Sequence, residues 1–289
     1  MTPRPIFVVG LQKSGTTLMA RLLKETGLVG APWRGEGDEF WGNTPAFAPA
    51  GNPAGVVYQR SGGRRGHEID AGEADDEVRA LLTSRLDGLE LGDEAWIVNK
   101  NPYNVLRIPW LRALFPEAII VAMIRHPVAN VFSLLKKHAQ RPGHSLSPEE
   151  GWWGVKPADW DRHIDQPIAE RCAWQWSEVN HVLDRDRRFA DAIVPYATLC
   201  DQPTAVVASV LGTSLTAAFP VLACLDDEFR RGGSLRSKNW APLSATAPER
   251  DVRRAADFDA LDEGTIAAIE RICHETVAGF PELAARVDR

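Results

Sequence analysis

The chain has 289 residues, 44% of them hydrophobic and 25% charged, a composition typical of globular domains. Its formal net charge of −6 argues against a general nucleic-acid binder, because such proteins depend on clustered lysine and arginine. No apolar run reaches the roughly 18 residues of a membrane span, and the run from Ile6 to Val9 is too short for a signal peptide. We therefore expect a soluble, cytoplasmic protein that binds neither nucleic acid nor membranes.

Short apolar runs alternate with helical patterns along the chain. Runs of the kind found in buried strands predict strands at residues 6–9, 95–98, 118–124 and 192–196. Apolar residues at helical spacing predict a helix that ends before Gly27 and further helices over residues 74–89, 109–114, 127–138, 168–183, 204–211 and 265–277. This alternation predicts an α/β fold in which helices flank both faces of a mostly parallel sheet. No repeat or linker divides the chain, so we expect a single domain over residues 1–289.

Two segments, at about residues 30–72 and 140–167, are dense in glycine and proline and lack a sustained period. Loops of this length are usually functional when they are ordered, and their aromatic residues favour order. The four cysteines are widely spaced without a C-x-x-C pair, which predicts neither a disulfide framework nor a zinc site. We expect the two loop-rich segments to form a binding surface.

The stretch VVGLQKSGTT, residues 8–17, lies between the first predicted strand and the first predicted helix. Two glycines five residues apart at such a junction direct backbone N–H groups toward a bound phosphate. A nucleotide triphosphatase has its lysine directly after the second glycine, where this chain has Thr16. The lysine of this loop is Lys13, so the sequence predicts a phosphate-binding loop with a displaced positive charge.

The run Lys13-Ser14-Gly15-Thr16-Thr17 resembles the 5′-phosphosulfate loop of sulfotransferases that use 3′-phosphoadenosine 5′-phosphosulfate (PAPS). A second hallmark of that family is an arginine at a strand end with a serine eight residues later, and RHPVANVFS contains Arg125 and Ser133 at this spacing. The resemblance extends over about residues 5–205 and is nearest to bacterial and Golgi-type members. The chain departs from the family at His126, where aspartate is common, and at Ala197, where glutamate usually follows the tyrosine.

The resemblance implies a sulfotransferase-like domain with PAPS as donor and 3′,5′-adenosine bisphosphate (PAP) as product. It implies that the phosphate loop holds the 5′-phosphosulfate and that Arg125 and Ser133 hold the 3′-phosphate. A basic stretch near residues 230–238 either closes over the donor or is a solvated loop. The donor-binding residues expected on this basis are Gly10, Gln12, Lys13, Ser14, Gly15, Thr16, Thr17, Arg125, Ser133, Tyr196, Arg236 and Lys238.

The transfer of a sulfonate group depends on positioning and on charge stabilisation at the leaving oxygen, a role that we expect for Lys13. The general base that takes the acceptor's proton is Glu36, Glu39 or His67, of which Glu36 matches the family position best. His67 lies in GGRRGHEID, which has the composition of an exposed polar loop. Lys100 follows the second predicted strand and is expected at the same sheet edge as the phosphate loop, near the acceptor or the sulfonate.

The predicted reaction is an in-line, metal-independent transfer of sulfonate to a hydroxyl or amine of a small-molecule or glycan acceptor. Tryptophan-rich stretches at residues 33–41 and 151–160 either wall the acceptor site or form a hydrophobic cluster under the loops. A P-loop kinase of small metabolites and a non-catalytic nucleotide-binding protein are the alternatives, and a homodimer is left open. The displaced Lys13 argues against the kinase.

Overall fold

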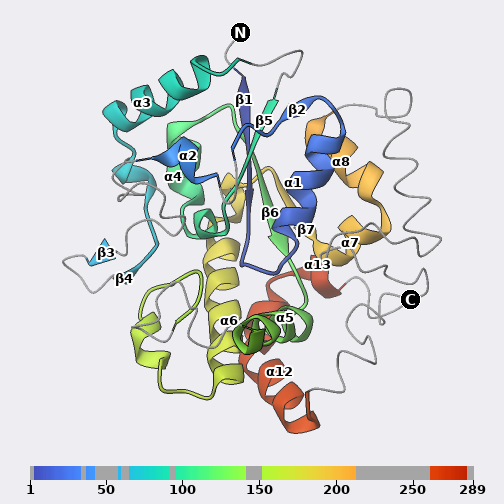
Figure 1. Cartoon of the computed structure of the whole chain (residues 1–289). Coiled ribbons are helices and arrows are strands. Elements are labelled where there is room, and N and C mark those ends of the chain that lie inside the picture. The colour runs from blue at the N-terminus through green and yellow to red at the C-terminus, as the bar shows by residue number, and fades with distance from the viewer. Residues whose placement is uncertain are drawn as a thin grey trace.

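The computed structural model describes residues 3–33, 37–42, 58–59, 65–90, 96–140, 152–212 and 261–284. Its centre is a five-stranded sheet in the order β2-β5-β1-β6-β7, and every neighbouring pair of strands is parallel (Figure 1). The five strands are β1 (Arg4–Val9), β2 (Val29–Gly30), β5 (Trp96–Lys100), β6 (Ile119–Ile124) and β7 (Ala192–Pro195). A separate antiparallel pair joins β3 (Tyr58–Gln59) to β4 (Arg65–Gly66).

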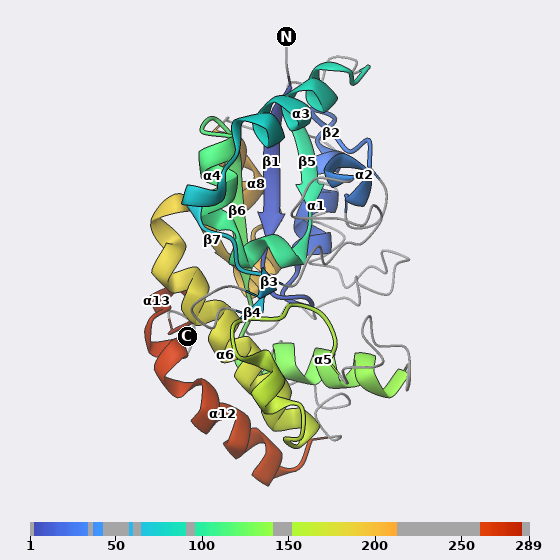
Figure 2. The ribbon, with the colours of Figure 1, turned by 90° about the vertical axis from the view of Figure 1, so that its left-hand side faces the viewer.

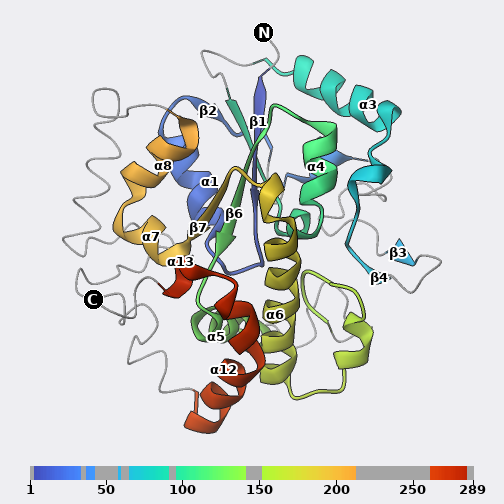
Figure 3. The same cartoon turned by 180° about the vertical axis from the view of Figure 1, so that it is seen from behind.

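Helices cover both faces of the sheet, as Figures 1 and 3 show from opposite sides. The α-helices are α1 (Thr16–Glu25), α2 (Asp38–Trp41), α3 (Asp76–Asp87), α4 (Ile108–Leu114), α5 (Pro127–Gln140), α6 (Ile168–Asp186), α7 (Tyr196–Asp201), α8 (Pro203–Leu211), α12 (Glu263–Ala278) and α13 (Pro281–Ala284). Short 3-10 helices are η2 (Ala71–Glu73), η3 (Pro102–Leu106), η5 (Trp160–His163) and η6 (Arg187–Phe189). Figure 2 shows α5, α6 and α12 extending beyond the ends to which the strand arrows point.

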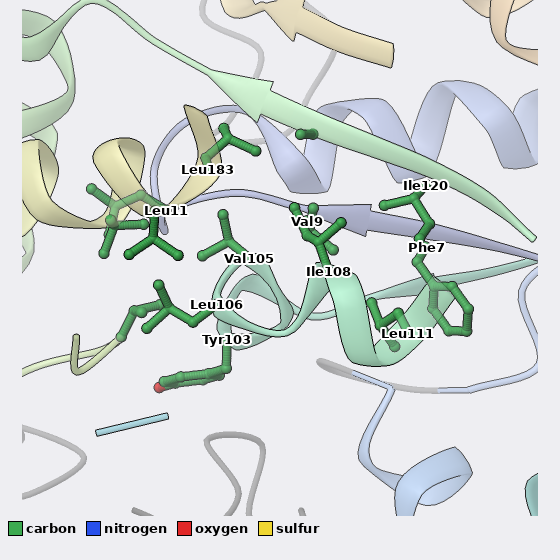
Figure 4. Packing of buried hydrophobic residues seen from close by; sticks show 14 of the residues in the cluster. Phe7, Val9, Leu11, Tyr103, Val105, Leu106, Ile108, Leu111, Ile120 and Leu183 are labelled. Carbon is green, nitrogen blue, oxygen red and sulfur yellow. The ribbon is translucent and has the colours of Figure 1, made fainter. Parts of the chain in front are cut away.

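The alternation of side chains along β1 divides the core into two layers. Ile6 and Val8 pack with α1, α7 and α8 on one face. Phe7 and Val9 pack on the other face with α3, α4 and α6, and Figure 4 shows them beside Ile108 of α4. Because the strand is buried on both faces, its sequence is continuously apolar. The predicted α/β class with helices on both faces is confirmed.

Most predicted elements are confirmed with boundaries shifted by one to three residues. The structure adds elements that are too short for a hydrophobic period to repeat several times, among them β2, α2, η3 and α7. Tyr196 begins α7 and does not end the preceding strand. On α3, Leu82 and Leu86 are buried, whereas Leu81 is 43% exposed. In the described part of the chain, no helix is long and apolar enough to cross a membrane.

Strands β1 and β6 are neighbours in the sheet, but after them the chain continues toward opposite edges of the sheet. From β1 the chain passes through α1 to β2 at one edge, and from β6 it passes through α5 and α6 to β7 at the other edge. The two strands lie side by side, with Val8 opposite Val121. Parallel sheets bind ligands at such a switch point, outside the carboxyl ends of the strands. The predicted phosphate loop and Arg125 both follow these two strand ends.

Candidate active site

The loop between β1 and α1 has a backbone that only particular residues adopt easily. Gly10, Lys13 and Gly15 all have positive φ angles, of 142°, 72° and 109°. A Cβ atom at Gly10 would lie 2.5 Å from the carbonyl oxygen of Met123, and one at Gly15 would lie 2.5 Å from the ring of Tyr196. The two glycines are therefore required both for their conformation and for the close approach of neighbouring groups.

The same loop has the chemistry of an anion site. Ser14 is 1% exposed, and its hydroxyl has no hydrogen-bond partner among the residues that the structure describes. Helix α1 begins at Thr16 without a side-chain cap, and its first turn contains no acidic residue. The first N–H groups of a helix lack partners within the helix and favour negative charge. The residues present fit a phosphate-like group, and the binding of such a group by this loop remains a prediction.

Arg125 connects the loop to the neighbouring strand end. Its Nη1 atom donates to the carbonyl oxygen of Lys13 at 3.4 Å and to Oγ of Ser133 at 3.3 Å. Its guanidinium carbon lies 4.3 Å from the ring centroid of Tyr196, a cation–π contact. The structure thus brings Lys13, Arg125, Ser133 and Tyr196 together, although Lys13 and Arg125 are 112 residues apart. Their binding roles remain predictions.

Lys100 ends β5, directly opposite Val8 of β1, and therefore lies at the predicted sheet edge. Its neighbour Asn99 is a site residue that the sequence analysis missed. The Asn99 amide donates to the carbonyl oxygen of Gly37 at 3.2 Å, and its oxygen accepts from the indole of Trp41 at 3.2 Å. A buried polar residue within an apolar strand was the available signal.

The contacts of Asn99 hold Gly37 and Trp41, which lie on either side of Glu39 in the chain. Gly37 follows Glu36 directly in the chain, and Glu36 itself lies outside the described residues. Glu39 is on α2 with an exposed side chain, whereas its neighbours Phe40 and Trp41 are buried. The structure therefore ties the chain next to Glu36 to the strand that ends in Lys100, and it leaves Glu39 open to solvent.

His67 does not lie in an exposed loop, and that expectation was wrong. It is 1% exposed, because the chain at β4 packs onto the segment around Lys156. The backbone N–H of Lys156 donates to Nδ1 of His67 at 2.9 Å, and Nε of Arg107 donates to the His67 carbonyl oxygen at 2.8 Å. Burial, together with the positive charges of Arg107 and Lys156, lowers the pKa of His67 well below its ordinary value of 6.5.

The lowered pKa of His67 predicts a loss of stability in mild acid. In the unfolded chain His67 protonates near pH 6.5, whereas in the folded protein it stays neutral to lower pH, so the unfolded state binds more protons. We expect the free energy of unfolding to fall as the pH drops below 6.5, with His67 contributing up to about 1.4 kcal/mol per pH unit. Urea unfolding at pH 7.5 and 5.5 measures this. His67→Asn keeps an acceptor oxygen but cannot titrate, so the pH dependence should be smaller in the variant; an unchanged dependence would contradict the prediction.

The tryptophans of the loop-rich segments are mostly core residues. Trp41, Trp152 and Trp160 are at most 6% exposed, so the interpretation of the segments as walls of an acceptor site is wrong for these three rings. Trp33 and Trp153 are only partly buried. Arg236 and Lys238 of the basic stretch lie outside the described residues. Among the residues that the structure does describe, no group of three histidine, cysteine or acidic side chains is placed to hold a metal ion.

Two curated proteins that are similar in sequence to this chain are protein-tyrosine sulfotransferases, one of them putative. The chain is 26% identical over 147 residues to protein-tyrosine sulfotransferase 1 of Danio rerio, covering 49% of this chain and 38% of that protein. It is 26% identical over 170 residues to a putative protein-tyrosine sulfotransferase of Caenorhabditis briggsae, covering 57% of this chain and 53% of that protein. The chain therefore spans only about two fifths to one half of the length of these curated relatives.

A solved sulfotransferase from Alicyclobacillus acidocaldarius aligns with a TM-score of 0.44 and 20% identity, over 95% of this chain and 96% of that one. A sulfotransferase from Mycobacterium avium aligns with a TM-score of 0.43 and 15% identity, over 91% of this chain and 78% of that one. The sequence profile of the Sulfotransferase family matches residues 5–213, which is most of the chain and includes the phosphate loop, Arg125 and Tyr196. The chain belongs to the sulfotransferase family.

Proposed function

We propose that this protein transfers a sulfonate group from PAPS to a hydroxyl or amine of a small-molecule or glycan acceptor and releases PAP. The observation that carries the proposal is the placement of two anion-binding groups at adjacent strand ends. Arg125 reaches Ser133 on one side and the backbone of the phosphate loop on the other, within 3.4 Å of each. A donor with a 5′-phosphosulfate and a separate 3′-phosphate requires two such groups, whereas ATP has no 3′-phosphate.

In the proposed complex, the loop N–H groups and the Ser14 hydroxyl bind the 5′-phosphosulfate, and Arg125 with Ser133 binds the 3′-phosphate. PAPS supplies an activated sulfonate, whose bond to the bridging oxygen breaks as the acceptor oxygen or nitrogen bonds to sulfur. Lys13 stabilises the negative charge that develops on the leaving oxygen. Lys100, at the end of the strand next to β1, orients the acceptor or the sulfonate.

We propose Glu36 as the general base, with Glu39 as the alternative. Glu36 precedes Gly37, whose carbonyl oxygen is bound by Asn99 at the sheet edge, while Glu39 is exposed. His67 is a weaker third choice because its Nδ1 already accepts from Lys156.

Removal of the base predicts a loss of turnover without a loss of donor binding. We expect Glu36→Gln to lower turnover about a hundredfold, because a positioned base contributes at least that much, and to leave the affinity for PAP unchanged. Bisphosphate release measures turnover, and calorimetry measures PAP binding. Glu39→Gln is the matched control and should keep most of its turnover. If Glu39→Gln loses turnover and Glu36→Gln keeps it, Glu39 is the base.

The proposed function is tested by comparing the thermal stabilisation that different nucleotides give. A ligand that binds only the folded state raises the melting temperature, and the shift grows with its concentration relative to Kd. We expect PAP to stabilise the protein more than AMP or ATP at equal concentration. A screen of phenols, alcohols, amines and simple glycans with PAPS, read by PAP release, then tests for transfer. Stronger stabilisation by Mg²⁺–ATP would favour the kinase, and PAP binding without transfer to any acceptor would favour a nucleotide-binding protein.

A further inference from the structure

The side chain of Gln12 joins the phosphate loop to a turn far away in the sequence. Its Nε2 donates to the carbonyl oxygen of Trp153 at 3.2 Å, and its Oε1 accepts from the backbone N–H of Val155 at 3.3 Å. Gln12 is 8% exposed; its bond with Val155 is buried, and its bond with Trp153 is partly buried. Buried hydrogen bonds of this kind are costly to break without replacement. The Gln12 side chain therefore binds the turn at residues 153–155, while its backbone belongs to the loop.

The turn is shaped to receive this amide. Gly154 has a φ angle of 85°, and a Cβ atom there would lie 1.7 Å from Nε2 of Gln12. The turn is also held from its other side, because Nε2 of Gln175 on α6 donates to the carbonyl oxygens of Trp153 at 3.0 Å and Val155 at 2.7 Å. Two glutamines thus bind one turn, but only Gln12 comes from the phosphate loop.

The turn presents Trp153 beside the helix that contributes to the donor site. The partly buried indole of Trp153 makes an edge-to-face contact with His138 of α5, with ring centroids 6.0 Å apart. Asn130 of the same helix donates to the backbone carbonyl oxygen of Gln12 at 3.0 Å. Ser133, proposed to bind the 3′-phosphate, lies between these two residues on α5. Trp153 is therefore partly exposed, and its backbone carbonyl oxygen is hydrogen-bonded to Gln12 of the phosphate loop.

We propose that Gln12 is a positioning residue that couples the donor loop to the Trp153 turn, so that donor binding orders this turn. The inference rests on the proposed function. A bound anion restricts the backbone of the loop, and Gln12 passes this restriction to the turn through its two side-chain bonds. Ordering of one site by the ligand of another is a coupling free energy, and it acts equally in both directions.

Hydrogen exchange at the turn tests this coupling with PAP as the probe. The N–H of Lys156 is the reporter, because it donates to His67 and not to Gln12. In the wild type, saturating PAP should slow exchange of the Lys156 N–H about five- to tenfold, the factor that one net hydrogen bond supplies. In Gln12→Met, a variant of equal length without the amide, this PAP-dependent protection should disappear even when PAP saturates the site.

Gln175→Met is the matched control, because it removes two bonds from the same turn without touching the loop. It should speed exchange of the turn with and without PAP, and it should keep the difference between the two states. If Gln12 has only a structural role, the exchange of the turn should respond to PAP in the same way in Gln12→Met and in Gln175→Met. Gly154→Ala is a second test, because its Cβ displaces the Gln12 amide, and it should abolish the protection as Gln12→Met does.

Protection that survives in Gln12→Met and in Gly154→Ala would overturn the inference. PAP binding to the wild type without protection of the turn would overturn the inference and leave the proposed function intact. Failure of PAP to stabilise the wild type at all would overturn the proposed function and the inference together.

Discussion

Lys13→Met should lower turnover about a thousandfold while the protein still binds PAP. Removing one group that stabilises developing charge in a closed site costs two to three orders of magnitude in rate. Lys13 lies in the phosphate loop in a left-handed conformation, with φ of 72°, and its carbonyl oxygen accepts from Arg125. Lysine and methionine are both unbranched at Cβ and pay a similar cost for this conformation, and the bond from Arg125 goes to the main chain. The variant therefore removes the charge and leaves the loop in place. Bisphosphate release with an acceptor from the screen measures the rate, and calorimetry measures the Kd of PAP.

Two control variants separate the local charge from general electrostatics. Lys13→Arg keeps a positive charge at this position and should retain most of the turnover, because that charge is the proposed source of the stabilisation. Lys24→Met removes an exposed lysine from the last turn of α1, the helix that follows the phosphate loop, and should leave turnover within about twofold. Turnover of Lys13→Met near the wild-type rate would exclude Lys13 from stabilising the leaving oxygen.

The sheet was predictable because burial leaves a local trace in the sequence. Strand β6 is enclosed on both faces, so Ile119–Ile124 is a continuous apolar run. Strand β2 and helix α7 have only two and six residues, and too few positions exist for a period to appear. Their form depends on the strands and helices against which they pack, which is information that the local sequence does not contain.

The candidate site was predictable where its residues belong to local motifs at strand ends. Parallel strands bring their carboxyl ends to one edge, so a loop after β1 and an arginine after β6 meet without any further information. The burial of His67 was not predictable, because its partner Lys156 is 89 residues away and does not follow a neighbouring strand. The contact between Asn99 and Gly37, 62 residues apart, was missed for the same reason. In both cases, side-chain bonds between segments far apart in the sequence decide the outcome, and such bonds follow no period.

Arg125→Met should weaken PAP binding several hundredfold and leave AMP binding within about threefold of the wild type. Hydrogen bonds to a charged group contribute about 1.5–3 kcal/mol each, and a guanidinium can make two of them to one phosphate. Arg125 stacks on Tyr196 and bonds to Ser133, so its side chain is held in place before a ligand arrives. Because AMP lacks the 3′-phosphate, it does not use these bonds. Calorimetric titration of both nucleotides into wild type and variant measures the ratio directly.

The ratio of the two affinities also separates binding from a structural role. Arg125 donates to the carbonyl oxygen of Lys13, so its loss could distort the whole phosphate loop. Distortion would weaken AMP and PAP by the same factor, whereas loss of a 3′-phosphate contact weakens PAP alone. Ser133→Ala removes one neutral donor and should raise the Kd of PAP only about fivefold, again without an effect on AMP. Arg21→Met, which removes a cation from the outer side of α1, should change neither affinity. Equal losses for both nucleotides in Arg125→Met would show that this arginine holds the loop and that the 3′-phosphate is bound elsewhere.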